Sequence, residues 1–142
     1  MASVEKTIVF DVPIDAIYET LIAYEQYPEF VDGVDEIKVL ESNEEGARVE
    51  YSLNVIKKLN YILTLSHEKP HRLSWELESG DIFKKNSGSW ELKDLGDGTT
   101  EVKYNLDVDV KLFVPKMIAK KLVEGNLPRM LKAYEEQAKK RL

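Results

Sequence analysis

The sequence predicts an α+β fold in which a seven-stranded antiparallel sheet wraps around one long C-terminal helix, with two short helices after the first strand. Residues 114–142 carry apolar side chains at the i, i+3, i+4, i+7 spacing of a helix with one buried stripe. The middle of the chain consists of alternating apolar and polar residues interrupted by turn residues. A helix of about 30 residues is about 40 Å long, so it needs a broad partner surface, which the sheet supplies.

The N-terminal part predicts one strand and two short helices. Val4, Ile8, Phe10 and Val12 share a face, as in a half-buried strand. Pro13 then fixes a backbone angle suited to the first turn of a helix over about residues 14–22. A second short helix is expected around 27–31, ended by the Asp-Gly pair at 32–33.

Six further strands are expected after these helices. Each is bounded by turn-forming residues, such as the sequence NEEG at 43–46 and the Asp-Gly pair at 97–98. Short turns between consecutive strands imply antiparallel pairing with one apolar face. The expected strands span residues 35–40, 48–55, 60–66, 73–78, 82–95 and 102–110.

Pro128 interrupts the long C-terminal helical pattern. A proline inside a helix removes one backbone hydrogen bond and clashes with the carbonyl four residues earlier, so a kink or break is expected near 124–126. Gly125 lies at the same place. The break would either let half of the helix move as a gate or only bend the helix along the sheet, and the sequence leaves both open.

Composition fits one domain over residues 1–142 and excludes several classes of protein. The chain has no cysteine, so disulfides and cysteine nucleophiles are excluded, and the expected location is cytoplasmic. A net charge of −6 disfavours DNA binding. Residues 116–142, however, hold eight Lys or Arg against three Glu. This basic helix face is either simply solvated or contacts a membrane, a ribosome or an acidic partner.

The predicted order of elements is similar to the helix-grip fold of the START-like (Bet v 1-like, SRPBCC) superfamily. Within it the chain resembles the polyketide cyclase/dehydrase and coenzyme Q-binding branch, which includes ribosome-association toxin proteins. The resemblance extends over the whole chain and rests on the order and spacing of short motifs. They are VP at 12–13, YPEFV at 27–31, VLE at 39–41, GDIFKK at 80–85, SGSW at 87–90, residues 99–104, and MLKAYEEQA at 130–138.

This resemblance implies a cavity between the concave face of the sheet and the long helix, suited to a hydrophobic small molecule. The strand and helix periods direct a set of apolar and tyrosine side chains toward that space, where they would line a cavity or simply fill a core. From the strands these are Tyr51, Leu53, Tyr61, Leu63, Leu65, Trp75, Leu77, Tyr104, Leu106 and Val108; from the helix they are Met117, Ile118, Leu122, Met130, Leu131 and Tyr134.

Catalytic signals are sparse. His67 shares strand parity with the inward leucines and is a weak candidate for a cavity base, as is Tyr61; the favoured interpretation of His67 is a hydrogen-bonded histidine of the core or of a strand end. No nucleophile elbow, phosphate loop or metal-ligand spacing occurs, so no cofactor and no metal are expected. The favoured function is a binding or carrier protein for a lipid, isoprenoid quinone or polyketide-like molecule. The alternatives are a cyclase or dehydratase that uses a cavity acid or base, and a regulatory protein that associates with ribosomes or membranes.

Overall fold

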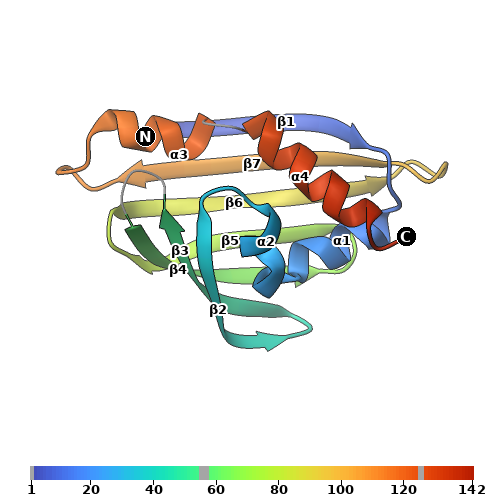
Figure 1. The fold of residues 1–142 in the computed structure, drawn as a ribbon, viewed down its shortest axis with the longest axis horizontal. Coiled ribbons are helices and arrows are strands. Elements are labelled where there is room, and N and C mark those ends of the chain that lie inside the picture. Colours follow the sequence, from blue (N-terminus) through green and yellow to red (C-terminus); the bar gives the residue numbers. More distant parts are fainter. Residues whose placement is uncertain (1, 55–57, 125–126) are drawn as a thin grey trace.

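One antiparallel sheet of seven strands forms the body of the protein in a computed structural model that describes residues 2–54, 58–124 and 127–142 (Figure 1). Its strand order is β1-β7-β6-β5-β4-β3-β2, so the first and last strands in the chain pair with each other. The sheet therefore confirms the predicted fold class. The strands are β1 (Ala2–Phe10), β2 (Val34–Asn43), β3 (Gly46–Asn54), β4 (Lys58–Glu68), β5 (Arg72–Gly80), β6 (Phe83–Asp94) and β7 (Thr100–Val110).

The helices lie together over one face of this sheet (Figure 1). The two short helices after the first strand are confirmed as α1 (Ile14–Ile22) and α2 (Tyr27–Phe30), joined by the 3₁₀ turn η1 (Tyr24–Gln26). None of the described helices is both long and apolar enough to cross a membrane.

The long C-terminal helix of the sequence prediction is divided into two. Helix α3 (Lys116–Glu124) packs along β1 and β7, and α4 (Leu127–Lys139) crosses the sheet (Figure 1). Pro128 occupies the second position of α4, where its missing N–H costs no bond within the helix. The expected break at 124–126 thus matches the end of α3, while residues 125–126 themselves lie outside the described residues.

Helix α4 is fixed at its C-terminal half. Glu135 Oε2 accepts a hydrogen bond from the backbone N–H of Asp11 at 2.8 Å. Just beyond the helix, Arg141 donates to Thr20 Oγ1 at 3.0 Å and to Gln26 Oε1 at 2.9 Å. Tyr134 is buried on the same half. These contacts tie the end of the chain to α1 and η1 and so determine where α4 crosses the sheet.

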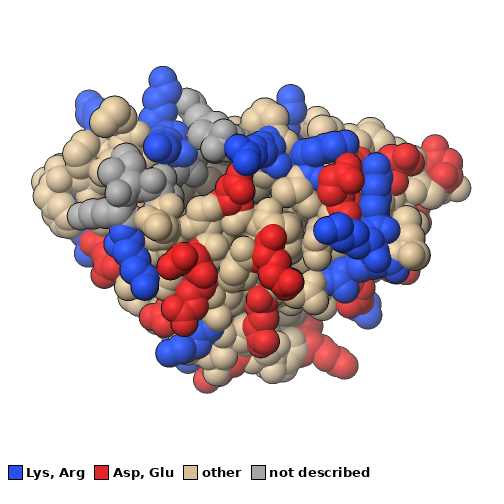
Figure 2. Space-filling view, in the orientation of Figure 1, with Lys and Arg blue, Asp and Glu red and all other residues tan. Residues whose placement is uncertain are grey.

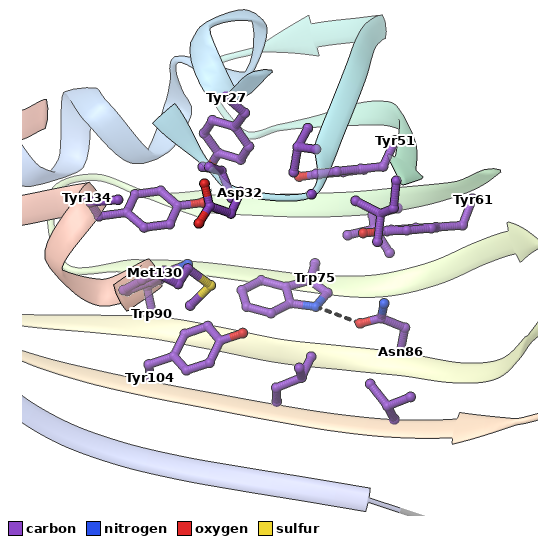
Figure 3. A pocket seen from close by; sticks show the side chains of 18 of the residues that line it. Tyr27, Asp32, Tyr51, Tyr61, Trp75, Asn86, Trp90, Tyr104, Met130 and Tyr134 are labelled. Carbon is purple, nitrogen blue, oxygen red and sulfur yellow. Dashed lines mark hydrogen bonds between the residues drawn. The ribbon is translucent and has the colours of Figure 1, made fainter. Parts of the chain in front are cut away.

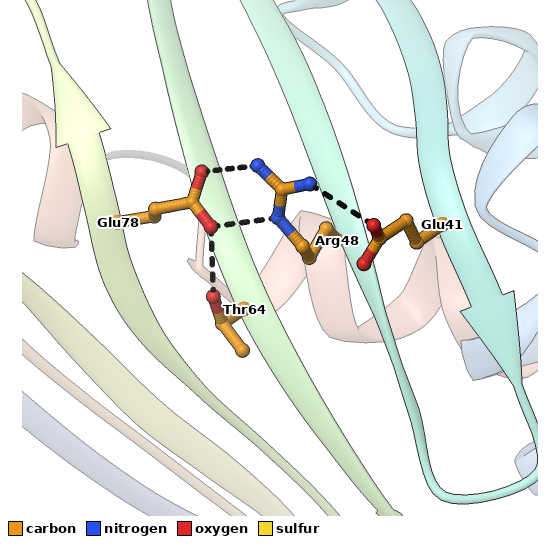
Figure 4. A network of polar contacts seen from close by, with 4 residues as sticks. All are labelled: Glu41, Arg48, Thr64 and Glu78. Carbon is orange, nitrogen blue, oxygen red and sulfur yellow. Dashed lines mark hydrogen bonds and ion pairs between the residues drawn. The ribbon is translucent and has the colours of Figure 1, made fainter.

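Strands β2 to β5 are linked on the face away from the helices by a charged network around Arg48 (Figure 4). Its guanidinium donates two hydrogen bonds to the Glu78 carboxylate, both at 2.8 Å, and lies 3.5 Å from Glu41. Thr64 adds a weaker bond to Glu78 at 3.4 Å. The hydrogen bonds from Arg48 hold the pKa of Glu78 below its usual value. One arginine thereby helps to fix the register of four neighbouring strands.

Candidate functional site

A cavity of about 510 Å³ lies between the sheet and helix α4. Its floor comes from strands β3 to β7, its roof from α4, and one side from α2 and the turn into β2 (Figure 3). Most of its lining is apolar or aromatic, as in typical small-molecule sites. The lining residues are Tyr27, Phe30, Val31, Asp32, Gly33, Val34, Tyr51, Leu53, Asn54, Tyr61, Leu63, Leu65, Leu73, Trp75, Phe83, Asn86, Trp90, Tyr104, Leu106, Val108, Lys121, Arg129, Met130, Ala133 and Tyr134.

Two groups of aromatic rings give the cavity rigid walls. At one end Tyr51 stacks on Tyr61, with ring centroids 5.1 Å apart and planes 4° from parallel. At the other end Trp90 contacts both Tyr104 and Tyr134, at 4.7 and 4.8 Å between centroids. Aromatic contacts of this kind add to the hydrophobic free energy of burial and restrict ring movement. The space between the two groups is therefore preformed.

Three tyrosine hydroxyls point into the space from opposite sides (Figure 3). They belong to Tyr51, Tyr61 and Tyr104, whose side chains are buried. Burial raises the pKa of all three phenols, so each hydroxyl keeps its proton at neutral pH. These groups therefore offer hydrogen-bond donors to an oxygen atom of a bound molecule, and they are poorly suited to act as bases.

The indole N–H of Trp75 donates to Asn86 Oδ1 at 3.1 Å (Figure 3). This bond fixes the Asn86 side chain, so that its amide nitrogen becomes a further oriented donor at the cavity wall. Gly88 makes room for the same indole: a Cβ there would lie 2.6 Å from the Trp75 ring and 2.2 Å from the Asn105 carbonyl oxygen. The sequence SGSW thus positions part of the cavity floor.

The rim of the cavity is charged, unlike its interior. Asp32, just after α2, and Arg129, in the first turn of α4, form an ion pair at 2.8 Å, with side chains 57% and 72% exposed. Lys121 from α3 and the exposed Asn54 also line this end. The ion pair joins the two segments on either side of the mouth.

The structure places most of the sequence-predicted lining residues around the cavity and excludes several. Tyr51, Leu53, Tyr61, Leu63, Leu65, Trp75, Tyr104, Leu106, Val108, Met130 and Tyr134 line it, whereas Leu77, Met117, Ile118 and Leu131 are not part of the lining. Leu77 and Ile118 pack on the core from outside the cavity, and Leu131 is buried in that core. Met117 is 71% exposed, because α3 runs along β1 and β7 rather than above the cavity. The side chain of Leu122 lies outside what the structure describes.

His67 is also absent from the cavity lining. Its Nε2 atom lies 2.7 Å from the hydroxyl of Tyr24 in η1, and the two rings stack at 6.0 Å. Partial burial lowers the pKa of His67, which favours the neutral ring; in the tautomer with its proton on Nδ1, Nε2 accepts a hydrogen bond from the Tyr24 hydroxyl. The histidine therefore joins β4 to η1, as expected of a structural histidine with a satisfied ring nitrogen, and the structure gives no support to the alternative of a cavity base. Tyr61, the other catalytic candidate, does line the cavity, but as a donor.

Sequence reasoning missed several lining residues, and two sets among them were missed for different reasons. The segment 31–34 and Arg129 lie far apart in the chain, and no local pattern indicates that they meet at the mouth. Leu73 and Trp90, in contrast, carry a usable signal, since Leu73 shares parity with Trp75 and Trp90 closes the SGSW motif. Among the described residues no cluster of three or more His, Asp or Glu side chains is placed to hold a metal ion.

A curved antiparallel sheet with a C-terminal helix across an apolar cavity is the helix-grip architecture of the START-like superfamily. The chain belongs to the family described as polyketide cyclase/dehydrase and lipid transport, whose profile matches residues 10–135. No match was found among curated protein sequences.

Solved structures agree with this assignment at the level of fold. A START superfamily protein from Mycobacterium smegmatis is 23% identical, with a TM-score of 0.84 and 99% of each chain covered. The Zhui aromatase/cyclase from Streptomyces sp. R1128 is 17% identical, with a TM-score of 0.87 over 99% of this chain and 94% of that one. Human STARD10 is 16% identical, with a TM-score of 0.76 over 97% of this chain and 63% of that one.

Proposed function

We propose that this protein binds or carries a hydrophobic small molecule with one or more oxygen acceptors, such as a lipid, an isoprenoid quinone or a polyketide-like compound. The observation that supports this most directly is the cavity of about 510 Å³ with an aromatic and aliphatic wall. Apolar lining favours burial of a hydrophobic ligand. The donors at Tyr61, Tyr104 and Asn86 would orient its oxygen atoms.

The same site supports binding better than cyclisation by a general base. His67 does not line the cavity, and the raised pKa values of Tyr61 and Tyr104 keep these phenols protonated. Among the described lining residues Asp32 is the sole carboxylate, and it is paired with Arg129. A reaction in this cavity would depend on tyrosine hydroxyls that donate hydrogen bonds to a substrate carbonyl group and so polarise it. The same hydrogen bonds would also bind that carbonyl group.

Native mass spectrometry followed by solvent extraction of the purified protein tests whether a hydrophobic molecule copurifies. A second test is fluorescence titration with Nile red, a neutral apolar dye that contains a carbonyl. The variant Ala133→Trp would fill the cavity from α4 and is expected to weaken dye binding at least about tenfold, equivalent to about 1.4 kcal/mol. Gln137→Trp, on the same helix outside the lining, is the matched control. No dye binding by the parent, or equal binding by Ala133→Trp, would count against the proposal.

A further inference from the structure

The turn between β7 and α3 presents three large apolar side chains to solvent. Leu112 is 94% exposed, Phe113 is 69% exposed, and Met117 on the first turn of α3 is 71% exposed. We refer to these three residues as the apolar tip. Single exposed apolar residues are common on soluble proteins, but a contiguous group of this size marks a contact surface.

The exposure of the apolar tip follows from how its turn is anchored. The backbone N–H of Lys111 donates to the Ile82 carbonyl at 2.8 Å, and that of Val114 donates to the Lys111 carbonyl at 2.9 Å. The Val114 side chain is buried, and Lys111 Nζ donates to the Gly80 carbonyl at 3.2 Å. Because residues 111 and 114 are both held by the body of the protein, the two residues between them are directed outward.

The tip is surrounded by positive charge. Residues 111–121 contain four lysines and no acidic residue, in a chain of net charge −6. Lys116, Lys120 and Lys121 are exposed on α3. Figure 2 shows Lys and Arg side chains over α3 and the start of α4 and a second group over the C-terminal end of α4, with many of the Asp and Glu side chains over the lower half.

Helix α4 does not carry a comparable excess of charge. Lys132 pairs with Glu135 and Glu136 at 3.3 and 3.2 Å, and Lys139 lies 4.0 Å from Glu136. The lysines of α3 are thus the positive charges next to the apolar tip, whereas Lys139, Lys140 and Arg141 form a second basic group at the far end of α4.

We propose that the apolar tip docks this protein on a membrane surface that contains anionic phospholipids. Leu112, Phe113 and Met117 enter the boundary between headgroups and acyl chains, and the lysines of α3 contact the anionic headgroups. Three protruding apolar side chains need no matching recess in a bilayer, because lipids rearrange around them. An acidic protein partner, or a second copy of this chain, needs an apolar recess of complementary shape.

This surface is connected to the cavity through α3. Lys121, one turn beyond Met117, lines the cavity at its charged mouth. A protein docked by its tip would therefore hold the mouth near the headgroups, where an apolar ligand passes between bilayer and cavity with little exposure to water. The ligand transfer rests on the proposed function, whereas the docking itself does not.

Vesicle flotation with the full chain tests the docking. Vesicles are made of phosphatidylcholine alone or with about one quarter phosphatidylserine, so that only the second kind has a strongly negative surface. The parent is expected to float with the second kind in about 0.1 M salt and much less in about 1 M salt, where charges are screened beyond about 3 Å.

Two pairs of variants separate the contribution of the apolar side chains to docking from the contribution of the lysine charges. Leu112→Ser/Phe113→Ser is expected to lower the bound fraction at least about tenfold, since tenfold equals about 1.4 kcal/mol, less than the burial of one such side chain contributes. Its control is Leu95→Ser/Leu142→Ser, which removes exposed leucines elsewhere. Lys116→Glu/Lys120→Glu is expected to have a similar effect, with Lys139→Glu/Lys140→Glu as the control of equal charge change.

Nile red binding in vesicle-free buffer is measured on the same variants, so that a failure of docking is distinguished from a failure of ligand binding. The tip variants are expected to bind the dye as the parent does, because neither Leu112 nor Phe113 lines the cavity. Equal flotation of tip variants and controls, or binding to neutral vesicles alone, would overturn the docking proposal. Loss of a dimer in Leu112→Ser/Phe113→Ser, with no flotation of the parent, would assign the tip to contact between copies instead.

Discussion

The ion pair between Asp32 and Arg129 provides a quantitative test of how the cavity opens. Asp32→Asn keeps the shape of the side chain and removes its charge. Because both partners are largely exposed, the pair is expected to contribute about 0.2–1 kcal/mol. If separation of α4 from the segment after α2 limits ligand release, a barrier lowered by up to about 1 kcal/mol speeds release up to about fivefold.

Stopped-flow dilution of Nile red-loaded protein measures this release, and a neutral dye avoids a direct charge effect of the substitution. The faster release of Asp32→Asn is expected in about 0.1 M salt and should disappear in about 1 M salt, where the parent pair is screened as well. Glu68→Gln removes a similarly exposed partner of Arg72, at 3.4 Å and outside the cavity lining, and should leave the rate unchanged. Equal rates for Asp32→Asn and the parent at low salt, or a difference that persists at high salt, would refute this view of the mouth.

Three further substitutions test the cavity wall and the fold. Tyr61→Phe and Tyr104→Phe each remove one donor and are expected to weaken Nile red binding by about 0.5–1.5 kcal/mol in titrations; unchanged affinity in both would argue against oriented donors. Gly88→Ala pushes a methyl group into the Trp75 ring and should lower the free energy of unfolding by about 1–3 kcal/mol in urea; a loss below about 0.5 kcal/mol would contradict the close approach. His67→Gln should reduce the loss of stability as pH falls. Burial depresses the pKa of His67 below its usual 6.5, so its contribution is present above that pH and is lost on acidification. Urea midpoints that fall equally with pH in parent and variant would rule this out.

Strand parity is sufficient to predict much of the cavity floor. In an antiparallel sheet with one apolar face every second residue points the same way, so Tyr51 and Leu53 on β3 and Tyr61, Leu63 and Leu65 on β4 are all found on the lining. The register between β4 and β5 shifts at residues 62–63, yet the two leucines after the shift still face the cavity. The extra residue at this shift is Glu78 in β5, so the alternation along β4 is not interrupted.

Helix periodicity predicts the cavity lining less well than strand parity, because it shows which side of a helix is buried but does not show which surface of the protein covers that side. Met130 and Tyr134 on α4 face the cavity, whereas Ile118 on α3 packs on the core outside it and Met117 faces solvent. The sequence pattern indicates a single buried stripe over residues 114–142, although it also predicts a kink or break near 124–126. Once the helix ends at Glu124 and begins again at Leu127, the two stripes cover different surfaces and cannot be assigned together.

The mouth could not be predicted for a related reason. Asp32 and Arg129 are separated by nearly the whole chain, and each lies in a segment whose local pattern indicates only a turn or a helix. Their contact depends on how α4 is held at its other end by Arg141 and Glu135. Charged residues on the rim of a cavity can thus be identified only from the tertiary structure. Apolar residues inside the cavity can be predicted from the alternation of side chains along each strand.

The chemistry of the lining also separates the two leading functions more sharply than the fold does. A cyclase that works through an enolate needs a base near the carbon atom next to the substrate carbonyl group. The described lining offers Asp32 as its sole carboxylate, and this side chain lies at the rim in an ion pair. A carrier needs only donors and an apolar wall, and Tyr61, Tyr104 and Asn86 meet that need deep in the cavity. Asp32→Asn therefore distinguishes the two functions. In a carrier it changes the rate of release and leaves equilibrium binding nearly unaltered, whereas in a base-dependent cyclase it would abolish turnover.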